Sequence, residues 1–322
     1  MPWNQFRVGV GQMTRAKRTY SPQELARKLV SSVVALGKTK SSLGALLGHV
    51  IVSIGTARCV EQCVREFLTW RLGSGTGIDA PVTRAELEQY LMQESQRWRQ
   101  KTLDQHRQAL SLLFCVTLPN LEAEIPTFTI GRAYTREEME QIARCQSEPN
   151  ALGTRIAFSG GLRASELIEL REAHELDPES NRPWRHDLFL GLPEGFIYRT
   201  TGKGGLARRV WVPLELHEQL QLRRLETPAS VVDRKVRRTR VFDIGGGQSL
   251  SESFSSSSIR TLGFSLGLHG LRHSYAQNRV EVLLTLGLAP LDCLEIVSQE
   301  LGHLRPDISL AYTPRRKNAA QN

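Results

Sequence analysis

Apolar residues in the first third of the chain recur every three or four positions, which is the period of an amphipathic helix. The pattern predicts four helices, over residues 56–72 and 102–117 and in segments that begin at Ser21 and Thr83. Both of these residues stand three positions before a glutamate, as in a capping box at a helix start. The glycine-interrupted apolar segment 41–52 is interpreted as a further short helix. We expect residues 21–118 to form an all-α domain, preceded by a flexible basic arm over residues 1–20.

The pattern changes after residue 118. Residues 119–133 carry two prolines and a glycine without helical period, which is typical of an interdomain linker. Further on, the β-branched and aromatic runs 196–201 and 208–213 flank the sequence GKGGLA and predict a hairpin. Helices are predicted from Thr135 and over residues 270–287 and 290–302, and the serine-rich run 251–258 is expected to be a loop or the lead-in to a helix. Residues 134–322 are therefore interpreted as an α+β domain.

The composition is that of an ordinary globular protein. Of 322 residues, 40% are hydrophobic and 23% are charged, which argues against a disordered, collagen-like or coiled-coil chain. The sequence has neither an apolar run of about eighteen residues nor an apolar stretch near its start, so we expect no membrane span and no secretory signal. Five cysteines without a Cys-x-x-Cys pair argue against a disulfide framework and against a zinc module. We expect reduced thiols and a cytoplasmic protein without a bound metal.

Charge gives the first indication of a partner. Lysine and arginine number 42 against 33 acidic residues, for a formal net charge of +9. The excess gathers in residues 1–40 and again in residues 223–240. Clustered positive charge attracts polyanions such as nucleic acid. A solvated basic surface explains the same charge equally well, so charge alone does not decide between the two.

Four segments in the second half carry residues suited to phosphate chemistry. They are SGGLRASELIEL with Arg163 and Glu166, TGKGGLARRV with Lys203, LHGLRHSYA with His269 and Arg272, and LGHLRPDISLAYTP with His303 and Tyr312. The planar fork of arginine matches phosphate oxygens, lysine and histidine move protons, and a tyrosine can act as a covalent nucleophile. Each residue alone is weak evidence, but together they suit phosphoryl transfer without a metal or another cofactor.

In this order, the four segments of residues 131–322 resemble the catalytic domain of the tyrosine recombinases, also called the phage integrase family. GLRASEL is similar to the family's first arginine segment, TGKGG to its hairpin lysine, HGLRHSYA to its His-x-x-Arg helix and LGHLRPDISLAYT to its tyrosine segment. The resemblance implies a mainly α fold with a small β-sheet. An all-α core-binding domain and an α+β catalytic domain would form a C-shaped clamp on DNA.

The resemblance also implies a role for each residue. Tyr312 would form a 3′-phosphotyrosyl link, Arg163 and Arg272 would hold the phosphate, Lys203 would protonate the leaving oxygen, His269 would help to activate the tyrosine, and His303 would hydrogen-bond the phosphate. The implied partner is double-stranded DNA with an inverted-repeat core site, held by a homotetramer. An accessory DNA-binding protein is a further candidate partner. The implied setting is a bacterial cytoplasm, in the integration, excision or cointegrate resolution of a transposon or other mobile element.

Two other functions remain open at this stage: a type IB topoisomerase, which uses similar residues, and a DNA-binding regulator without catalytic activity. Three departures from the family pattern stand out. The first segment carries Ser159-Gly160-Gly161, the stretch from Arg272 to His303 is long, and ten residues follow Tyr312. The long stretch predicts an inserted turn or loop near residues 284–292. The short tail puts in doubt the coupling of subunits through a C-terminal helix. Tyr198 and Tyr275 are interpreted as packing residues, and His273 as a helix-packing or phosphate-adjacent residue rather than a further catalytic group.

Overall fold

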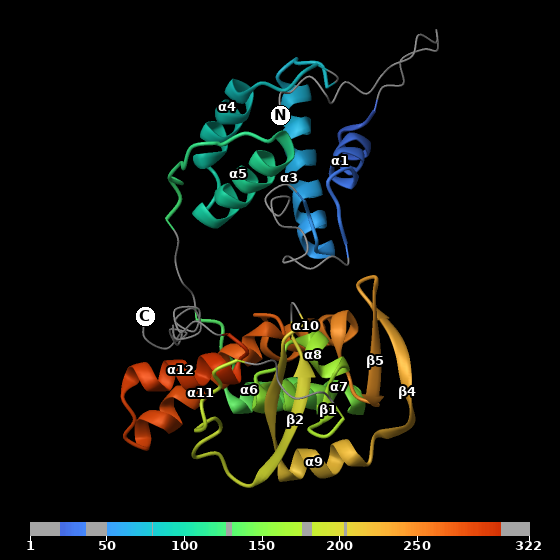
Figure 1. The fold of residues 1–322 in the computed structure, drawn as a ribbon, viewed down its shortest axis with the longest axis vertical. Coiled ribbons are helices and arrows are strands. Elements are labelled where there is room, and N and C mark those ends of the chain that lie inside the picture. Colours follow the sequence, from blue (N-terminus) through green and yellow to red (C-terminus); the bar gives the residue numbers. More distant parts are fainter. Residues whose placement is uncertain are drawn as a thin grey trace. The chain divides into compact units, whose positions relative to one another are not determined.

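The computed structural model describes residues 20–36, 50–78, 80–126, 131–175, 182–202 and 205–303. The chain divides into two compact units, Met1–Phe128 and Thr129–Asn322 (Figure 1). This division falls within the proline-containing stretch 119–133. Nearly all of the predicted basic arm and most of the segment 41–52 lie outside the described residues, as do Lys203 and Tyr312.

The first unit is helical throughout its described elements. These are α1 (Pro22–Ser31), α3 (Ile54–Gly73), α4 (Arg84–Ser95) and α5 (Gln100–Phe114). Both predicted capping boxes are present: the hydroxyl oxygens of Ser21 and Thr83 each accept a hydrogen bond, at 3.2 Å, from the backbone N–H three residues on. A single core fills the space between the helices, and Phe67, Leu91 and Leu110 are completely enclosed in it.

The second unit combines helices with two small antiparallel sheets. Its helices are α6 (Arg136–Arg144), α7 (Glu148–Gly160), α8 (Ala164–Ile168), α9 (Leu214–Gln221), α10 (Gly247–Leu262), α11 (His269–Thr285) and α12 (Pro290–Glu300). Its strands are β1 (Arg171–Glu172), β2 (Gly195–Thr201), β3 (Ala207–Pro213), β4 (Arg224–Asp233) and β5 (Val236–Phe242). One sheet has the order β1-β2-β3, and β4 pairs with β5. The predicted class, mainly α with a small β-sheet, is confirmed.

Several local predictions can be compared with these elements. The predicted hairpin is confirmed as β2–β3, whose register runs from Gly195–Pro213 to Thr201–Ala207. A turn also lies where one was predicted, because α11 ends at Thr285 and α12 begins at Pro290. The expectation of a loop or lead-in at residues 251–258 was wrong, since this run lies inside α10.

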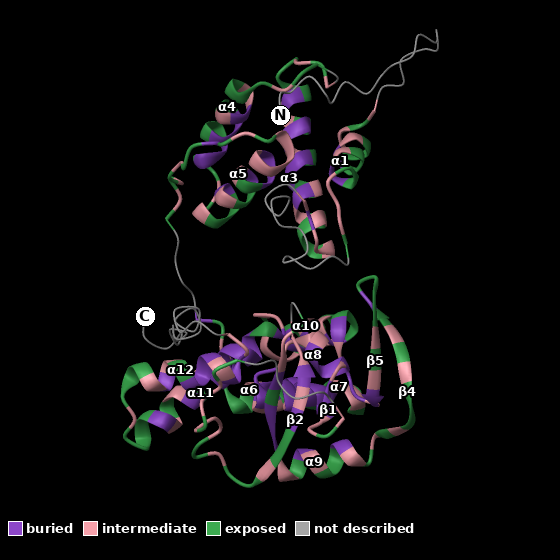
Figure 2. Cartoon of the chain, in the orientation of Figure 1, coloured by how far each residue is buried: buried purple, intermediate pink, exposed green. Residues whose placement is uncertain are grey.

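The serine-rich run is helical because it is packed and its hydroxyl groups are satisfied. Phe254 is completely buried in the core of the second unit, and Figure 2 shows buried residues along the helices of this unit. The buried Ser257 and Ser258 donate hydrogen bonds to the backbone oxygens of Cys145 and Phe264, at 3.3 and 2.7 Å. Tertiary packing thereby outweighs the weak helix propensity of serine.

Two further observations bear on the protein's class. No helix in the described ranges has both the length and the apolar character required to cross a membrane. The five cysteines, all within the described residues, are free thiols.

Candidate active site

The first arginine segment is shaped by a tight turn between α7 and α8. Gly161 ends α7 in the left-handed region, with φ of +59°, and an added Cβ would lie 2.7 Å from side-chain atoms of both Tyr275 and Leu301. Only glycine fits such a position without strain or displacement. The turn leads into Arg163, the N-cap residue of α8, whose backbone N–H donates to Glu166 Oε2 at 2.9 Å. The sequence Gly-Gly-Leu-Arg therefore fixes where the Arg163 side chain starts.

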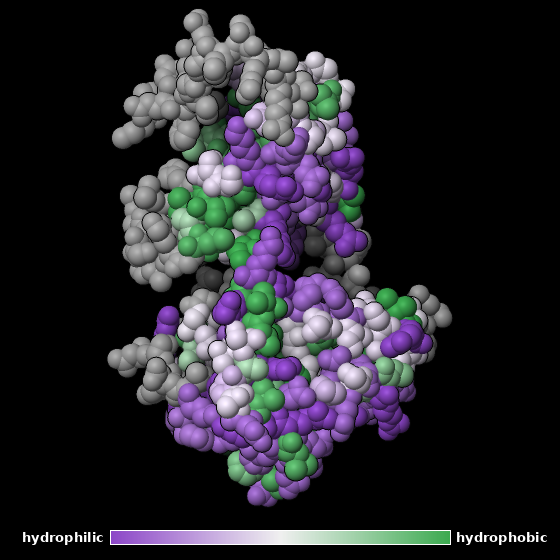
Figure 3. All heavy atoms as spheres, turned by 90° about the vertical axis from the view of Figure 1, so that its right-hand side faces the viewer, coloured by the Kyte–Doolittle hydropathy of each residue, from purple (hydrophilic) through white to green (hydrophobic). Residues whose placement is uncertain are grey.

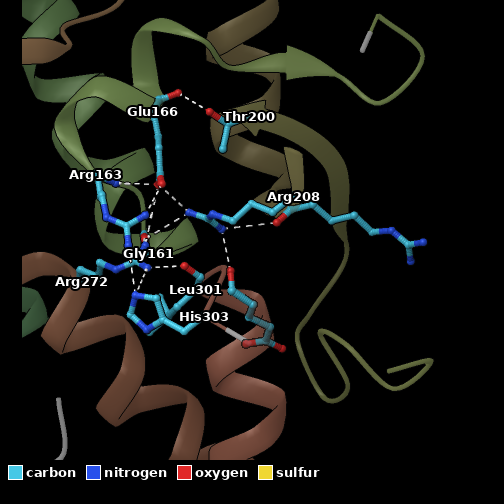
Figure 4. A network of polar contacts seen from close by, with 10 residues as sticks. Gly161, Arg163, Glu166, Thr200, Arg208, Arg272, Leu301 and His303 are labelled. Atoms are coloured by element: carbon cyan, nitrogen blue, oxygen red, sulfur yellow. Dashed lines mark hydrogen bonds and ion pairs between the residues drawn. The ribbon is translucent and has the colours of Figure 1, made fainter. Parts of the chain in front are cut away.

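Glu166 is the carboxylate around which the site is organised. Its side chain is 1% exposed and contacts the guanidinium groups of three arginines, Arg163, Arg208 and Arg272, the last at 3.8 Å (Figure 4). Burial alone would raise the pKa of this carboxyl, but the three cations outweigh it and lower the pKa to about 2. Glu166 is therefore ionised at neutral pH and holds the arginines in place.

Arg208 is a member of this cluster that the sequence did not indicate. It lies on β3 and is 1% exposed, and its Nη2 donates to Glu166 Oε2 at 2.8 Å. Its Nη1 donates to the backbone oxygen of Glu300 at 2.6 Å. One guanidinium thus joins β3, α8 and the end of α12. Its sequence context is that of an ordinary strand residue, and its acidic partner stands 42 positions away, so no local pattern identifies it.

Arg272 and His303 meet Arg163 from two other segments. Arg272, in the first turns of α11, is fully buried and donates to the backbone oxygens of Gly161 and Leu301. His303 follows α12, and its Nε2 lies 3.0 Å from Arg163 Nη2 and 3.3 Å from Arg272 Nη2. Because arginine nitrogens only donate, Nε2 acts as the acceptor, which assigns the neutral tautomer protonated at Nδ1. Burial and the arginines Arg272 and Arg163 lower the pKa of His303 to about 3.

The histidines of the His-x-x-Arg helix lie at the start of α11. His269 is its first residue and lies at the surface, with its ring 5.6 Å from that of the buried His273. Although part of the ring is exposed, the loss of hydration on its protein-facing side and the charge of Arg272 lower the pKa of His269 to about 4. Burial and Arg132 likewise lower the pKa of His273, to about 4. Both rings are therefore neutral at pH 7.

The segment that carries Lys203 approaches the same cluster, although Lys203 itself lies outside the described residues. A Cβ added to Gly202 would lie 3.2 Å from Glu166 Oε1 and 3.9 Å from Arg163 Nη1. Thr200, two positions earlier on β2, donates from its hydroxyl to the backbone oxygen of Glu166 at 2.7 Å. The base of the β2–β3 turn is thereby held against α8.

The two tyrosines interpreted as packing residues are enclosed by the protein. Tyr275 is 4% exposed and donates to Glu300 Oε2 at 2.8 Å. Burial raises the pKa of its phenol well above the ordinary value. Tyr198 is 1% exposed, and burial raises its pKa to about 12. Neither phenol is exposed or readily ionised, so their interpretation as packing residues is confirmed.

The described part of the site carries an excess of positive charge. Three guanidinium groups surround one carboxylate, so positive charge remains in excess when the histidines are neutral. The Arg163 side chain, 29% exposed, brings this charge to the surface. Within the described residues, no group of His, Cys, Asp or Glu has the composition of a metal site. An excess of fixed donors around a partly exposed arginine suits a phosphate group that gains charge during reaction.

Comparison with known proteins gives a result for structure alone. No family model and no curated protein sequence matches the chain. Among solved structures, the XerH site-specific recombinase in a post-cleavage complex with palindromic difH substrate is similar, with a TM-score of 0.54 and 15% identity. The match covers 95% of this chain and 96% of that chain.

Two further solved structures show the same likeness. The Tn1549 transposon integrase in complex with circular intermediate DNA gives a TM-score of 0.50 at 13% identity, over 89% of this chain and 94% of that chain. A lambda integrase tetramer bound to a Holliday junction gives 0.50 at 14%, over 85% of this chain and 75% of that chain. Identities this low establish a shared architecture without establishing a shared activity. The chain therefore has the fold of the tyrosine recombinases.

Proposed function

We propose that this chain is a tyrosine recombinase, which cuts and rejoins DNA through a covalent bond between Tyr312 and the scissile phosphate. One observation carries the proposal: Arg163, Arg272 and His303 come from segments up to 140 positions apart and meet around a single point. These are residues that the sequence resemblance names for holding the phosphate. The shared fold supports the same assignment.

The arginines and His303 would hold the phosphate. Arg163 is the exposed member of the pair, so its planar fork would meet two non-bridging oxygens first. His303 Nε2 now accepts from both arginines, so an incoming phosphate oxygen would compete with it as the acceptor. Once displaced as the acceptor, His303 would turn to donate its Nδ1–H to the phosphate, and both guanidinium groups would donate to it and stabilise the charge that develops on it.

Tyr312, His269 and Lys203 would carry out the bond exchange. The phenol oxygen of Tyr312 forms a bond to phosphorus while its proton passes to His269, which is neutral at pH 7. The bond from phosphorus to the 5′ oxygen breaks, and Lys203 gives that oxygen a proton. Attack by a 5′-hydroxyl of a partner strand reverses the sequence, so bond energy is conserved and no external energy source is consumed. The position of Gly202 against Glu166 and Arg163 supports the place of Lys203 in this scheme.

The DNA partner and assembly belong to the same proposal. Residues 21–118 would form a core-binding domain, residues 119–133 a linker, and residues 134–322 the catalytic domain. The substrate would be a duplex with an inverted-repeat core site, in the integration, excision or resolution of a mobile element, and the active assembly a homotetramer. The palindromic substrate of XerH and the tetramer of lambda integrase support these features by analogy of fold.

The test is a covalent-adduct assay on a nicked duplex, from which the cleaved end diffuses away so that the adduct accumulates. Duplex DNA that copurifies with the wild-type protein, or that the protein enriches from a pool of sequences, supplies the recognition sequence. Tyr312→Phe should bind that DNA normally and form no adduct, because only the phenol oxygen is removed. Tyr20→Phe, in the first unit, is the matched control and should react normally. Adduct formation by Tyr312→Phe would refute the assignment, and adduct without strand exchange would indicate a topoisomerase.

A further inference from the structure

The hairpin β4–β5 ends in an unusual turn. Asp233 and Val236 form its last pair, so Arg234 and Lys235 alone make the connection. Both have positive φ, 49° and 68°, as a type I′ turn requires. Such turns favour Asn-Gly because most side chains are strained there. This chain instead places two long cationic side chains at the turn, and the strain suggests that their charge serves a function.

The hairpin is held against the body of the second unit, which a lone two-stranded ribbon would need for stability. Asp233 Oδ1 accepts from the backbone N–H of Gln248, in the first turn of α10, at 2.8 Å. Arg238 Nη1 forms an ion pair with Glu169 Oε1 at 2.9 Å. Arg171 also donates to the backbone oxygen of Thr239 on β5. One side of the hairpin is therefore fixed beside α8 and α10 (Figure 1).

The opposite side and the tip are open to solvent. Arg234, Lys235 and Arg237 are exposed, and Val232, paired with Arg237 in the register, is 70% exposed. Neither Lys235 nor Arg237 forms an ion pair with any other described residue. Figure 3 views the molecule from this side and shows a mostly hydrophilic surface on the second unit, crossed by a narrow band of hydrophobic side chains. The tip thus presents uncompensated positive charge on a fixed support.

The ion pair between Arg238 and Glu169 places the hairpin close to the candidate active site. Glu169, the anchor of Arg238, is the C-cap of α8, and Arg163 is its N-cap. At a rise of about 1.5 Å per residue, these two ends are roughly 9 Å apart along the helix. That distance is of the order of three base steps, at about 3.4 Å each along one strand. A duplex whose phosphate lies at Arg163 would therefore have further phosphates within reach of the hairpin.

We propose that the tip of β4–β5, with Arg234, Lys235 and Arg237, is a second DNA contact that binds backbone phosphates beside the cleavage site. This inference rests on the proposed function, since it takes duplex DNA as the polyanion. Because phosphates carry no base information, the contact strengthens binding to all sequences alike and sets the position of the duplex on the second unit. An acidic protein surface is the alternative partner that the experiment must separate.

The test replaces the turn by the residues that its backbone favours. Arg234→Asn with Lys235→Gly keeps the type I′ turn and removes two charges. It also removes the hydrogen bond from Arg234 Nε to Gln248 Oε1 at 2.6 Å, but the contacts of Asp233 and Arg238 with the body of the unit remain, so the hairpin should stay folded. Binding to duplex DNA is measured by fluorescence anisotropy at several salt concentrations, in a Tyr312→Phe background. Each lost phosphate contact should lower the slope of log Kobs against log salt by about 0.9. We expect a decrease of about 0.9 to 1.8 for the double variant.

The control removes the same charge elsewhere on the second unit. Arg144→Gln with Arg182→Gln replaces two exposed arginines that lie outside the hairpin, and it should leave the slope nearly unchanged. Equal slopes for the two double variants would overturn the assignment of the hairpin. If the Tyr312→Phe protein with an unsubstituted hairpin does not bind DNA at all, the proposed function would be overturned instead. Competition by polyglutamate as strong as by DNA of equal charge would indicate a general polyanion surface and would also overturn the assignment.

Discussion

Replacement of Glu166 by glutamine should destabilise the second unit strongly at neutral pH and less in acid. The change removes one buried negative charge that faces Arg163, Arg208 and Arg272 and keeps the side-chain shape. Arg208 is itself 1% exposed, so its charge would be left in a buried position without a carboxylate. Removal of one partner of a buried ion pair typically costs about 3–5 kcal/mol.

The pKa of Glu166 gives an independent magnitude. The pKa falls from 4.5 to about 2 on folding, and at 1.36 kcal/mol per pH unit this gap corresponds to about 3 kcal/mol. Because the folded pKa is the lower one, this stability is fully present above pH 4.5 and is lost as the pH falls toward 2. Linkage gives a loss of about 1.4 kcal/mol between pH 7 and roughly pH 3.5. The glutamine side chain does not titrate, so the difference in free energy of unfolding between wild type and variant should shrink by that amount.

Urea unfolding of the wild-type protein and of Glu166→Gln, each at pH 7 and at roughly pH 3.5, measures the change in the free energy of unfolding. Hydrogen exchange in β3 and α8 assigns the transition to the second unit. Glu140→Gln is the matched control, because the ion pair of Glu140 with Arg155 is partly exposed, at 32% and 28%. It should cost less than about 1 kcal/mol. A disadvantage of Glu166→Gln that stays constant between the two pH values would refute the role assigned to its charge.

Three further predictions concern the site. Gly161→Ala should cost about 2 kcal/mol or more in urea unfolding because its Cβ would overlap Tyr275 and Leu301, whereas Gly263→Ala, at a positive φ in open space, should cost only about 1 kcal/mol; equal costs would contradict the packing argument. Arg163→Lys or Arg272→Lys should lower single-turnover adduct formation by about 10²-fold or more while DNA binding persists, and normal rates in both would reject the clamp. Lys203→Ala should be slow on ordinary DNA and recover on a 5′-bridging sulfur at the scissile phosphate, since a thiolate leaves without a proton; Arg163→Ala should not recover, and identical behaviour would reject separate roles.

The features that sequence predicts well are those set by neighbouring residues. The capping boxes at Ser21 and Thr83 and the presence of the β2–β3 hairpin depend on side chains a few positions apart, so local spacing is sufficient to find them. The serine-rich run 251–258 was misjudged because its helix depends on packing against distant residues. The β4–β5 hairpin appeared in the sequence only as a basic cluster, because the packed face of β5 carries Arg238 and Arg240, where the alternation of a half-buried strand would place apolar residues.

The active-site prediction likewise succeeded for residues in recognisable sequence segments and missed a residue whose partners are distant in the sequence. Arg163, Arg272 and His303 stand in recognisable segments, and the structure brings them together. Arg208 lies in the segment TGKGGLARRV, where the resemblance names Lys203 alone, yet the same carboxylate that holds Arg163 holds Arg208 as well. Because Arg208 belongs to β3 and donates to the end of α12, any movement of the β2–β3 hairpin must move a residue tied to Glu166. The lysine hairpin and the arginine pair are therefore mechanically connected through one buried carboxylate, a connection that only the three-dimensional arrangement reveals.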